Sequence, residues 1–434
     1  MRRLPVRTRP RGMIAALAFT LCLAAGCTQA SQDVAGAPSI TTSTPTPSPT
    51  VSPRRTLTPS PEPAFRVGND PIHAAWSDAI NATIDGRDVS VAVGLGDRIV
   101  YTHLGEKPRV LASNEKLLTS MAALDKLGPS FRYRTSAAAD ERPRAGVVHG
   151  DLWLVGGGDP TLTPTDLSAL AERLRQAGIR RVTGDVIGDT AAFDRGWWAP
   201  GWLPQISRAY VTRPTALRLV GGDSKPEGEA ASVFTTAVRN AGVEVDGETS
   251  VTAAPRHLTE LASIESPPMS QLLVEQNHES DNLYAELATK VLGRRIGDEA
   301  STTWGARVIQ RWARHVGSDS TVHDGSGLSD QDRTSADGMV TMLLDARRAP
   351  WFQALYSSLP AGGEGTLSSR LGGVPVRAKT GTLFIRPASA LSGYVRTKAG
   401  TLVAFSVLTH DLPESTAVAI EDDVVRTLAG SSIR

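Results

Sequence analysis

The folded region of this 434-residue chain contains no cysteine. The only two cysteines, Cys22 and Cys27, lie in an apolar segment close to the N-terminus. A disulfide framework is therefore excluded for the folded region, and so is a thiol nucleophile. Any hydrolytic or group-transfer chemistry must rely on an oxygen nucleophile or on a metal.

The chain also lacks an excess of charge of either sign. Its 46 basic and 45 acidic residues leave a formal net charge of +1. We therefore expect neither a nucleic-acid groove nor a polybasic membrane surface. Beyond the N-terminal segment, no apolar run approaches the ~20 residues that a membrane-spanning helix requires. Any membrane attachment is expected to come from the N-terminal end.

Residues 1–27 have the pattern of a secretory signal. Several arginines precede the uncharged apolar run from Met13 to Ala25, so the protein is expected to leave the cytoplasm. The run ends in Leu-Cys-Leu-Ala-Ala-Gly-Cys, which resembles the lipobox of bacterial lipoproteins and marks Cys27 for lipidation. Simple cleavage and an uncleaved anchor are the alternatives. We expect a cell-envelope protein, held at the membrane by a lipid anchor or otherwise secreted.

Residues 28–69 form a Pro/Ser/Thr-rich linker with almost no apolar side chains. Such a segment cannot build a core and prefers extended, polyproline-like conformations of ~3.1 Å per residue. About 36 residues of this kind could hold a domain roughly 100 Å from its anchor. We therefore interpret the segment as a disordered tether in the cell envelope.

Folded sequence begins near residue 70 and divides into three segments. Residues 70–130 open with a helical pattern at 74–84, followed by a predicted β-hairpin in VSVAVGLGDRIVYTH. Residues 131–261 contain short strand patterns and many turns around a predicted helix, which indicates an inserted α/β subdomain. Residues 262–434 return to long helical patterns and end in three strand patterns, which predict an antiparallel sheet, and a closing helix.

The stretch VLASNEKLLTSMAALDKLG predicts a helix whose first turn carries Ser113 and Lys116. Leu117, Met121 and Leu124 lie on one stripe, so the helix is expected to be buried. An isolated Ser-x-x-Lys is usually an N-capping serine followed by a solvated lysine. A desolvated lysine one turn from a serine can, however, act as its general base.

Two further motifs favour the catalytic interpretation. The only Ser-x-x-Lys is at 113–116, the only Ser-x-Asn at 280–282, and the only Lys-Thr-Gly at 379–381. In this order the three motifs resemble the signature of the penicillin-binding protein and serine β-lactamase superfamily. The superfamily fold is an antiparallel sheet with flanking helices, so the expected fold class is α/β (α+β).

Other features resemble one branch of that superfamily. They are a long insertion between the first two motifs, the phrases GGGDPTL and SDNLYAE, and DGSGLS before the third motif. All are similar to the D-alanyl-D-alanine carboxypeptidase/endopeptidase family typified by penicillin-binding protein 4, peptidase family S13. The resemblance implies a cofactor-independent serine hydrolase that acts on peptidoglycan stem peptides and is inhibited by β-lactam antibiotics.

The resemblance also assigns roles in bond making and proton transfer. Ser113 would be the acylated nucleophile and Lys116 its base. Ser280 would relay a proton toward the leaving amine, and Asn282 would hold the amide on the acyl side of the substrate.

The third motif is expected to line the site from a strand. Lys379 would supply positive potential, and Thr380 and Thr382 would meet the terminal carboxylate of the substrate. Gly381 completes the motif. The backbone amides of Ser113 and Thr382 would form the oxyanion hole, where each donor is worth roughly 10²–10³ in rate.

Two other functions are compatible with the same residues. The first is a β-lactamase-like hydrolase, although no Glu-x-x-Leu-Asn is present to supply the deacylating carboxylate of class A enzymes. The second is a non-catalytic envelope protein that binds peptidoglycan or senses β-lactams. A catalytic metal is not expected, because no His/Cys/Asp/Glu group has the spacing of metal ligands.

Several other polar and aromatic residues have more ordinary interpretations. His278 is expected to form a helix-end hydrogen bond, and Asp159 and Asp189 are expected to stabilise turns. The tryptophans of RGWWAPGW are expected to pack a surface loop rather than grip a ligand. For Asp324 and Ser326, shaping the cleft floor and plain turn chemistry remain open.

Overall fold

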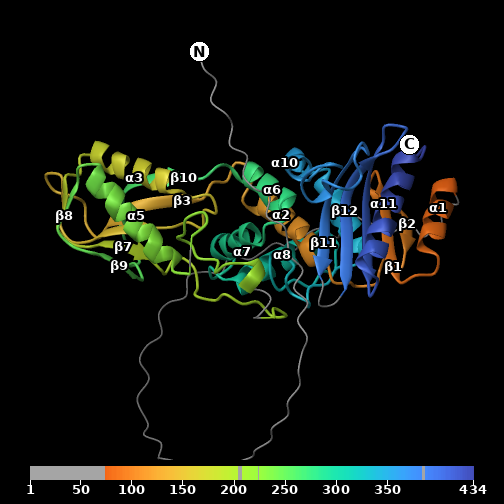
Figure 1. Cartoon of the computed structure of the whole chain (residues 1–434), viewed down its shortest axis with the longest axis horizontal. Coiled ribbons are helices and arrows are strands. Elements are labelled where there is room, and N and C mark those ends of the chain that lie inside the picture. The colour runs from red at the N-terminus through yellow and green to blue at the C-terminus, as the bar shows by residue number, and fades with distance from the viewer. Residues whose placement is uncertain (1–73, 204–207, 223, 384–386) are drawn as a thin grey trace, which may run out of the picture. The chain divides into compact units, whose positions relative to one another are not determined.

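The computed structural model describes residues 74–203, 208–222, 224–383 and 387–434. The predicted signal, Cys27 and the linker lie outside the described residues. The described chain combines three sheets with helices (Figure 1). The helices are α1 Ala75–Ile84, α2 Glu115–Lys126, α3 Pro164–Gln176, α5 Pro226–Asn240, α6 Met269–His278, α7 Asn282–Ile296, α8 Thr302–His315, α9 Ala336–Ala346, α10 Phe352–Ser358 and α11 Glu414–Gly430, with short 3₁₀ turns η1 Ala112–Asn114 and η2 Gly365–Leu367.

The first sheet has five antiparallel strands in the order β11-β12-β13-β1-β2. The first strand of the chain, β1, therefore pairs with the last, β13. Helices α1 and α11 cover one face, and α9 packs on the other. The strands are β1 Val89–Leu95, β2 Arg98–His103, β11 Val376–Leu383, β12 Ala388–Arg396 and β13 Leu402–His410.

Strands between Arg134 and Glu265 form the other two sheets. A mixed sheet has the order β10-β3-β5-β7-β9, and a small parallel sheet has the order β4-β6-β8. Helices α3 and α5 pack together against the mixed sheet around a separate hydrophobic cluster. The strands are β3 Arg134–Ala139, β4 Val147–Val148, β5 Leu152–Val155, β6 Arg181–Val182, β7 Val186–Asp189, β8 Glu244–Val245, β9 Thr249–Thr252 and β10 Thr259–Glu265.

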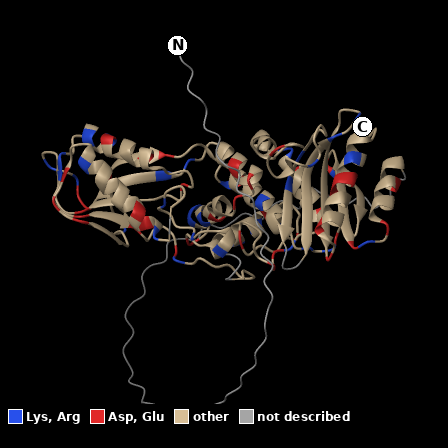
Figure 2. Ribbon diagram, viewed as in Figure 1, with Lys and Arg blue, Asp and Glu red and all other residues tan. Residues whose placement is uncertain are grey.

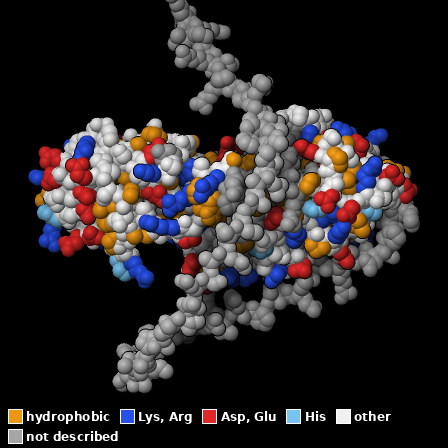
Figure 3. Space-filling view, turned by 60° about the horizontal axis from the view of Figure 1, so that its bottom comes forward, with side chains coloured by type: hydrophobic (Ala, Val, Ile, Leu, Met, Phe, Trp, Pro, Cys, Tyr) orange, Lys and Arg blue, Asp and Glu red, His pale blue; other side chains and the backbone are white. Residues whose placement is uncertain are grey.

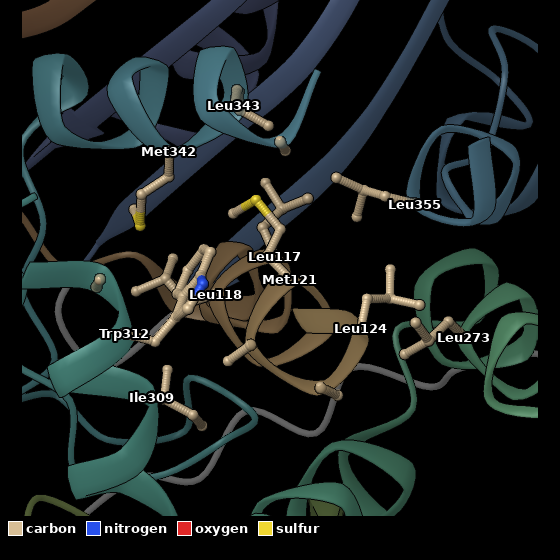
Figure 4. Close-up of a cluster of buried hydrophobic side chains, with 14 of the residues drawn as sticks. Leu117, Leu118, Met121, Leu124, Leu273, Ile309, Trp312, Met342, Leu343 and Leu355 are labelled. Atoms are coloured by element: carbon tan, nitrogen blue, oxygen red, sulfur yellow. The ribbon is translucent and has the colours of Figure 1, made fainter. Parts of the chain in front are cut away.

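Helix α2 is surrounded by other helices, as its apolar sequence predicts. Figure 4 shows its apolar side chains pointing toward residues of α6, α8, α9 and α10. All of these side chains are buried, and burying one Leu or Met contributes about 1.5–3 kcal/mol. The first turn of α2 is therefore held firmly in place. The residues labelled on α2 are Leu117, Leu118, Met121 and Leu124.

The predicted fold class is confirmed, and so are the elements on which it was based. The helix at 74–84, the following hairpin and the three adjacent C-terminal strands all occur within a residue or two of the predicted bounds. The helices α5, α9 and α10 were not predicted individually. Helix α9 is buried on nearly every side, so its sequence lacks the polar stripe that marks an amphipathic helix.

Charges are distributed without a dominant patch in the views shown. Figure 2 shows acidic and basic residues interspersed over the helices and loops, while the strands of the first sheet are mostly uncharged. On the face in Figure 3, both signs are mixed and hydrophobic side chains occur in small groups. The described part of the chain contains no helix with the length and hydropathy of a membrane span.

The tryptophans of RGWWAPGW take part in packing. The rings of Trp197 and Trp198 stack with centroids 5.1 Å apart, and Trp202 is buried against Val211 and Ala199. The Nε1–H of Trp202 also reaches beyond this cluster to another loop, as described below. The packing interpretation therefore agrees with the structure.

Candidate active site

Ser113 lies in η1, which leads directly into α2. Ala112, the residue before it, has a φ of 47°, a left-handed conformation that costs a non-glycine residue about 1–3 kcal/mol. The turn is fixed from two sides. A Cβ on Gly327 would collide with the Ala112 carbonyl, and Asn114 donates from Nδ2 to the Lys379 carbonyl at 2.8 Å.

Lys116 lies one turn further along and is completely buried. Its Nζ is 3.1 Å from Ser113 Oγ, 2.7 Å from Asn282 Oδ1 and 2.7 Å from the Ser326 carbonyl oxygen. Burial lowers the pKa of Lys116 from its ordinary value to about 8, although nearby carboxylates oppose this effect. The neutral amine is therefore accessible near neutral pH.

The surroundings of Lys116 suit a neutral amine that accepts a proton. A neutral amine has two N–H donors and one lone pair. The two carbonyl oxygens of Asn282 and Ser326 can take both donors. The lone pair is then left for the hydroxyl of Ser113, which can donate its proton to Lys116. This is the geometry required of a general base.

Ser280 and Asn282 lie at the junction of α6 and α7. Ser280 has a φ of 56°, so the chain turns sharply between the two helices. Asp281 caps α7 by accepting from the Tyr284 amide at 3.0 Å, and Asn282 is the first residue of the helix. Lys379 Nζ donates to Ser280 Oγ at 2.9 Å. The second and third motifs thus meet through this contact.

Strand β11 carries the third motif and is an edge strand, paired only with β12 within its sheet. The Ala378 amide donates to the Pro360 carbonyl, which lies on the side away from β12. Because backbone N–H groups alternate in direction along a strand, the amides of Thr380 and Thr382 point to this same free edge. The Thr382 amide is therefore available to an oxygen atom bound beside β11.

Gly381 allows β11 to approach the turn that carries Ser113. A Cβ at Gly381 would lie 2.6 Å from the Leu111 carbonyl oxygen and 3.1 Å from the Ser113 amide nitrogen. Real side chains do not tolerate such contacts, so another residue at this position would push the strand away. Glycine thus keeps the Thr382 and Ser113 amides near each other.

Lys379 is buried like Lys116. Burial and the charge of Lys116 both lower the pKa of Lys379 well below its ordinary value. Its Nζ donates to Ser280 Oγ and to the Thr380 carbonyl at 2.8 Å. An anion placed beside Lys379 would favour its ammonium form, so its positive charge is coupled to anion binding.

An open pocket of about 360 Å³ lies beside Ser280 and Asn282 and is also lined by residues 208–212. Tyr210 has 53 % of its surface exposed, yet its carbonyl accepts a hydrogen bond from Asn282 Nδ2 at 2.9 Å. One of the two N–H donors of Asn282 Nδ2 is therefore occupied. A ligand carbonyl that binds Asn282 uses the second donor or replaces the Tyr210 carbonyl.

Asp159 and Asp189 stabilise turns, as the sequence predicts. Asp159 accepts from the Thr161 amide and hydroxyl, and Asp189 accepts from the Ala191 and Ala254 amides. Both carboxylates thus stabilise turns. The expected helix-end hydrogen bond of His278 is not found for Nε2, which is buried without a partner among the described residues.

Asp324 has both of the roles that the sequence left open. It accepts from the Ser326, Gly327 and Ser329 amides, which is turn chemistry. It also accepts from Trp202 Nε1 at 2.6 Å, and the turn that it holds presents the Ser326 carbonyl to Lys116. Asp324 therefore helps to shape the floor beneath Lys116.

Three contributors to the site were not predicted from the sequence. They are the Asn114 side chain and the carbonyl groups of Ser326 and Tyr210. Two of these act through backbone carbonyl groups, which every residue type has, so the sequence does not indicate them. Asn114 occupies a variable position within Ser-x-x-Lys, so the motif gave no signal for it. Among the described residues, no group of three or more His, Cys, Asp or Glu side chains could hold a metal ion.

Comparison with known proteins identifies the family. The sequence profile of the D-Ala-D-Ala carboxypeptidase 3 (S13) family matches residues 84–227 and 223–430. The chain belongs to the S13 peptidase family. It is therefore a hydrolase of the D-Ala-D-Ala carboxypeptidase class, and the resemblance of its three motifs to this family is confirmed.

Curated S13 relatives match most of the chain. A D-alanyl-D-alanine carboxypeptidase of Actinomadura sp. (strain R39) is 29% identical, covering 79% of this chain and 80% of the relative. Carboxypeptidase DacB of Mycolicibacterium smegmatis is 28% identical, covering 86% of this chain and 88% of the relative. This chain therefore spans most of the length of both S13 relatives.

A solved structure shows the same fold. Penicillin-binding protein 4 of Haemophilus influenzae superposes with a TM-score of 0.68 at 21% sequence identity, covering 82% of this chain and 100% of that chain. At this level of identity the likeness concerns the fold alone. The penicillin-binding/β-lactamase-like fold predicted from the motifs is confirmed for this S13 peptidase.

Proposed function

We propose that this S13 peptidase removes the terminal D-alanine from peptidoglycan stem peptides through an acyl-enzyme on Ser113. The observation that carries the proposal is the contact between Ser113 Oγ and the buried Lys116 Nζ. The carbonyl oxygens of Asn282 and Ser326 accept from the same Nζ and leave its lone pair for Ser113. This arrangement activates an otherwise weak nucleophile. It has no purpose in a protein that only binds its ligand.

In the acylation step, Ser113 Oγ attacks the carbonyl carbon of the penultimate D-alanine while Lys116 takes the serine proton. The developing oxyanion would lie between the amides of Ser113 and Thr382, which the close approach at Gly381 holds near each other. The C–N bond then breaks, and the proton that Lys116 took from Ser113 passes through Ser280 to the leaving amine, so Lys116 is neutral again. The Ser280 hydroxyl lies beside Lys379.

In the deacylation step, a water molecule attacks the ester carbonyl and the shortened peptide leaves as a carboxylic acid. Lys116 takes the proton of the water and returns it to Ser113 Oγ, which restores the resting site.

Lys379, with Thr380 and Thr382, would hold the terminal carboxylate of the substrate before D-alanine is released. Burial disfavours the ammonium form of Lys379. The bound carboxylate would favour that form, so Lys379 would carry its positive charge when substrate is present.

Binding of β-lactam antibiotics is part of the same proposal. A β-lactam presents a strained amide and a carboxylate to the same groups, so it should acylate Ser113. A solved complex of Haemophilus influenzae penicillin-binding protein 4 contains a β-lactam, which supports this expectation. Cleavage of cross-linked dimers, which the resemblance to the carboxypeptidase/endopeptidase family implies, also belongs to the proposed activity.

A decisive measurement uses the purified protein with three substrates. A stem pentapeptide should lose one D-alanine, a cross-linked dimer should be split, and a penicillin should remain attached rather than be turned over, all detectable by mass spectrometry. Rapid release of hydrolysed penicillin would instead indicate a β-lactamase. Stable binding without any cleavage would indicate a sensor.

Replacing Asn282 with alanine is expected to reduce turnover about 10-fold or more, because one polar contact to the transition state is lost. Thr382→Val should have a similar effect, since the hydroxyl of this exposed residue is expected to meet the terminal carboxylate of the substrate. Steady-state kinetics with the pentapeptide measures both, and thermal unfolding should show that both variants fold. Near-normal turnover in both variants would remove these side chains from the site.

We also propose that Cys27 is lipidated and tethers the enzyme outside the cytoplasm through residues 28–69. The support is the lipobox-like leader followed by the Pro/Ser/Thr-rich segment. Replacing Cys27 with serine should move the protein from the membrane fraction to the soluble envelope fraction. Mutant protein that stays in the membrane fraction with an intact leader would show that the leader itself is the anchor.

We also propose that the folded part of the chain divides into three segments. Residues 70–130 and 262–434 would build the penicillin-binding domain, and residues 131–261 the inserted subdomain. The strands of the mixed sheet between Arg134 and Glu265, with their own hydrophobic cluster, support this division. The second boundary falls within β10, which pairs with β3, so limited proteolysis that cuts before β3 and after β10 would test the division.

A further inference from the structure

A cluster of buried carboxyl groups lies under the site and has no part in the mechanism above. It consists of Glu115, Glu286, Asp324 and Asp332, all less than 1% exposed. They come from α2, from α7 and from the loop between α8 and α9. Carboxyl groups are rarely buried unless they are paired. Lys116 is a cation that acts on both Glu115 and Glu286, and the buried Lys290 on α7 also acts on Glu286.

Glu286 is the member that is connected to Lys116 by hydrogen bonds. Its Oε1 accepts from the Gly325 amide at 3.0 Å and from the Ser326 amide at 2.9 Å. The carbonyl of the same Ser326 accepts from Lys116 Nζ at 2.7 Å. Glu286 also lies one turn after Asn282 on α7, and Asn282 provides the other acceptor for Lys116. One helix thus positions both acceptors of the amine.

The surroundings of two other members of the cluster, Glu115 and Asp332, favour the neutral carboxyl form. Neither carboxyl oxygen of Glu115 has a hydrogen-bond partner among the described residues. Burial and the nearby carboxylates raise the pKa of Glu115 well above its ordinary value. Asp332 Oδ1 accepts from the His323 amide at 2.7 Å, while its Oδ2 has no hydrogen-bond partner among the described residues. Burial and the charges of Asp324 and Glu115 raise the pKa of Asp332 well above its ordinary value.

Glu286 differs from these two groups because its charge is compensated. Two backbone amides and Lys116 favour its carboxylate, while burial and Asp324 oppose it, so the pKa of Glu286 is raised only to about 7. The two backbone amides and Lys116 thus favour the ionised form of Glu286 more than any contact does for Glu115. Its charge is close enough to favour the ammonium form of Lys116.

We propose that Glu286 is a positioning residue for the base: it holds the Gly325–Ser326 turn against Lys116, and its negative charge stabilises the ammonium that Lys116 becomes during acylation. This inference rests on the proposed function, in which Lys116 takes the proton of Ser113. The other titratable groups that act on Lys116 are Asp324 in the loop, Asp281 before α7 and Glu115 on α2, and the charge of Lys379 on β11 opposes that of Lys116.

The substitution Glu286→Gln separates the two roles. A glutamine can keep its oxygen where Oε1 accepts from Gly325 and Ser326, so the turn is retained while the charge is lost. Loss of the charge disfavours the ammonium of Lys116. The acidic limb of kcat/KM against pH should therefore move to lower pH by about one unit, which raises the neutral fraction of Lys116 about tenfold below the wild-type limb. The rate at high pH should fall a few-fold, because the base is weaker.

The substitution Glu286→Ala removes both roles. Above the acidic limb it should lower kcat/KM by about 10-fold or more, because the turn that presents the Ser326 carbonyl to Lys116 loses Glu286 and is held by Asp324 alone. Asp337→Asn is the matched control. Asp337 is a largely buried carboxyl on α9 that accepts from Thr102 and is not among the charges that act on Lys116. Its acidic limb should coincide with that of the wild type.

Penicillin labelling at Ser113 is measured on the same samples as a function of pH. An unchanged acidic limb in Glu286→Gln, with normal labelling, would overturn the charge role while leaving the proposed function intact. Wild-type activity in Glu286→Ala would overturn the positioning role. Absence of Ser113 labelling in the wild type would instead refute the proposed function itself. If Glu286→Ala fails to fold, the pH profile of Glu286→Gln still decides the inference.

Discussion

Replacing Ser113 with alanine should abolish acylation by penicillin and lower D-alanine release by about 10⁴-fold or more, because the attacking oxygen is removed. The fold should persist. Ser113 is only half-buried, and the helix that carries it is held by the apolar side chains of α2 rather than by this hydroxyl. Mass spectrometry of the tryptic peptide that contains Ser113 measures the label directly.

The control for this experiment is a serine of the same region that is not expected to react. Ser120 lies two turns further along α2, is fully buried and contacts Gln276 and Asn277. Ser120→Ala should therefore still be labelled at Ser113. Label on another serine, or equal labelling of Ser113→Ala and wild type, would show that the nucleophile is wrongly assigned.

Replacing Lys116 with alanine should slow acylation by about 10²–10⁴-fold, the contribution of a positioned general base. Lys116→Met, which fills more of the buried space, should be equally slow if the amine rather than its volume is required. In the wild type, the acylation rate should fall below about pH 8, because the pKa of Lys116 lies near that value and its protonated form cannot accept the serine proton. Both variants should lose this limb.

Acylation rates measured by stopped flow across the pH range test this prediction. A limb near pH 8 that survives in Lys116→Ala would assign it to another group, of which Lys379 is the obvious candidate because its pKa is also lowered. Lys379→Ala should then remove the limb instead. Such a result would exchange the roles of the two lysines while keeping Ser113 as the nucleophile.

The sequence was sufficient for the fold class, the family and most of the predicted site. The hairpin and the three C-terminal strands follow from alternation of apolar residues, and α2 follows from the apolar stripe beside Ser113. Three short motifs, each present once, pointed to the residues that the structure brings together. A nucleophile activated by a neighbouring lysine requires particular side chains at both positions. The residue types in the sequence therefore reveal this part of the site.

Other parts of the site could not be predicted because they depend on backbone atoms and on burial. The Ser326 and Tyr210 carbonyl groups reach Lys116 and Asn282 from segments far away in the sequence. A carbonyl group is common to all residues, so no residue type marks these positions. The close approach of β11 to η1 explains Gly381 only once both segments are in place.

The sequence by itself determined which residues could carry the chemistry: Ser113, Lys116, Ser280 and Lys379 stand in motifs whose order and composition are specific. Only the tertiary structure decided their protonation states and their surroundings. The pKa of Lys116 depends on how completely the chain removes water from it and on how near Glu286 and Asp324 come. Burial and distance arise from the packing of α2, α7 and β11 together, and no local stretch of sequence specifies them.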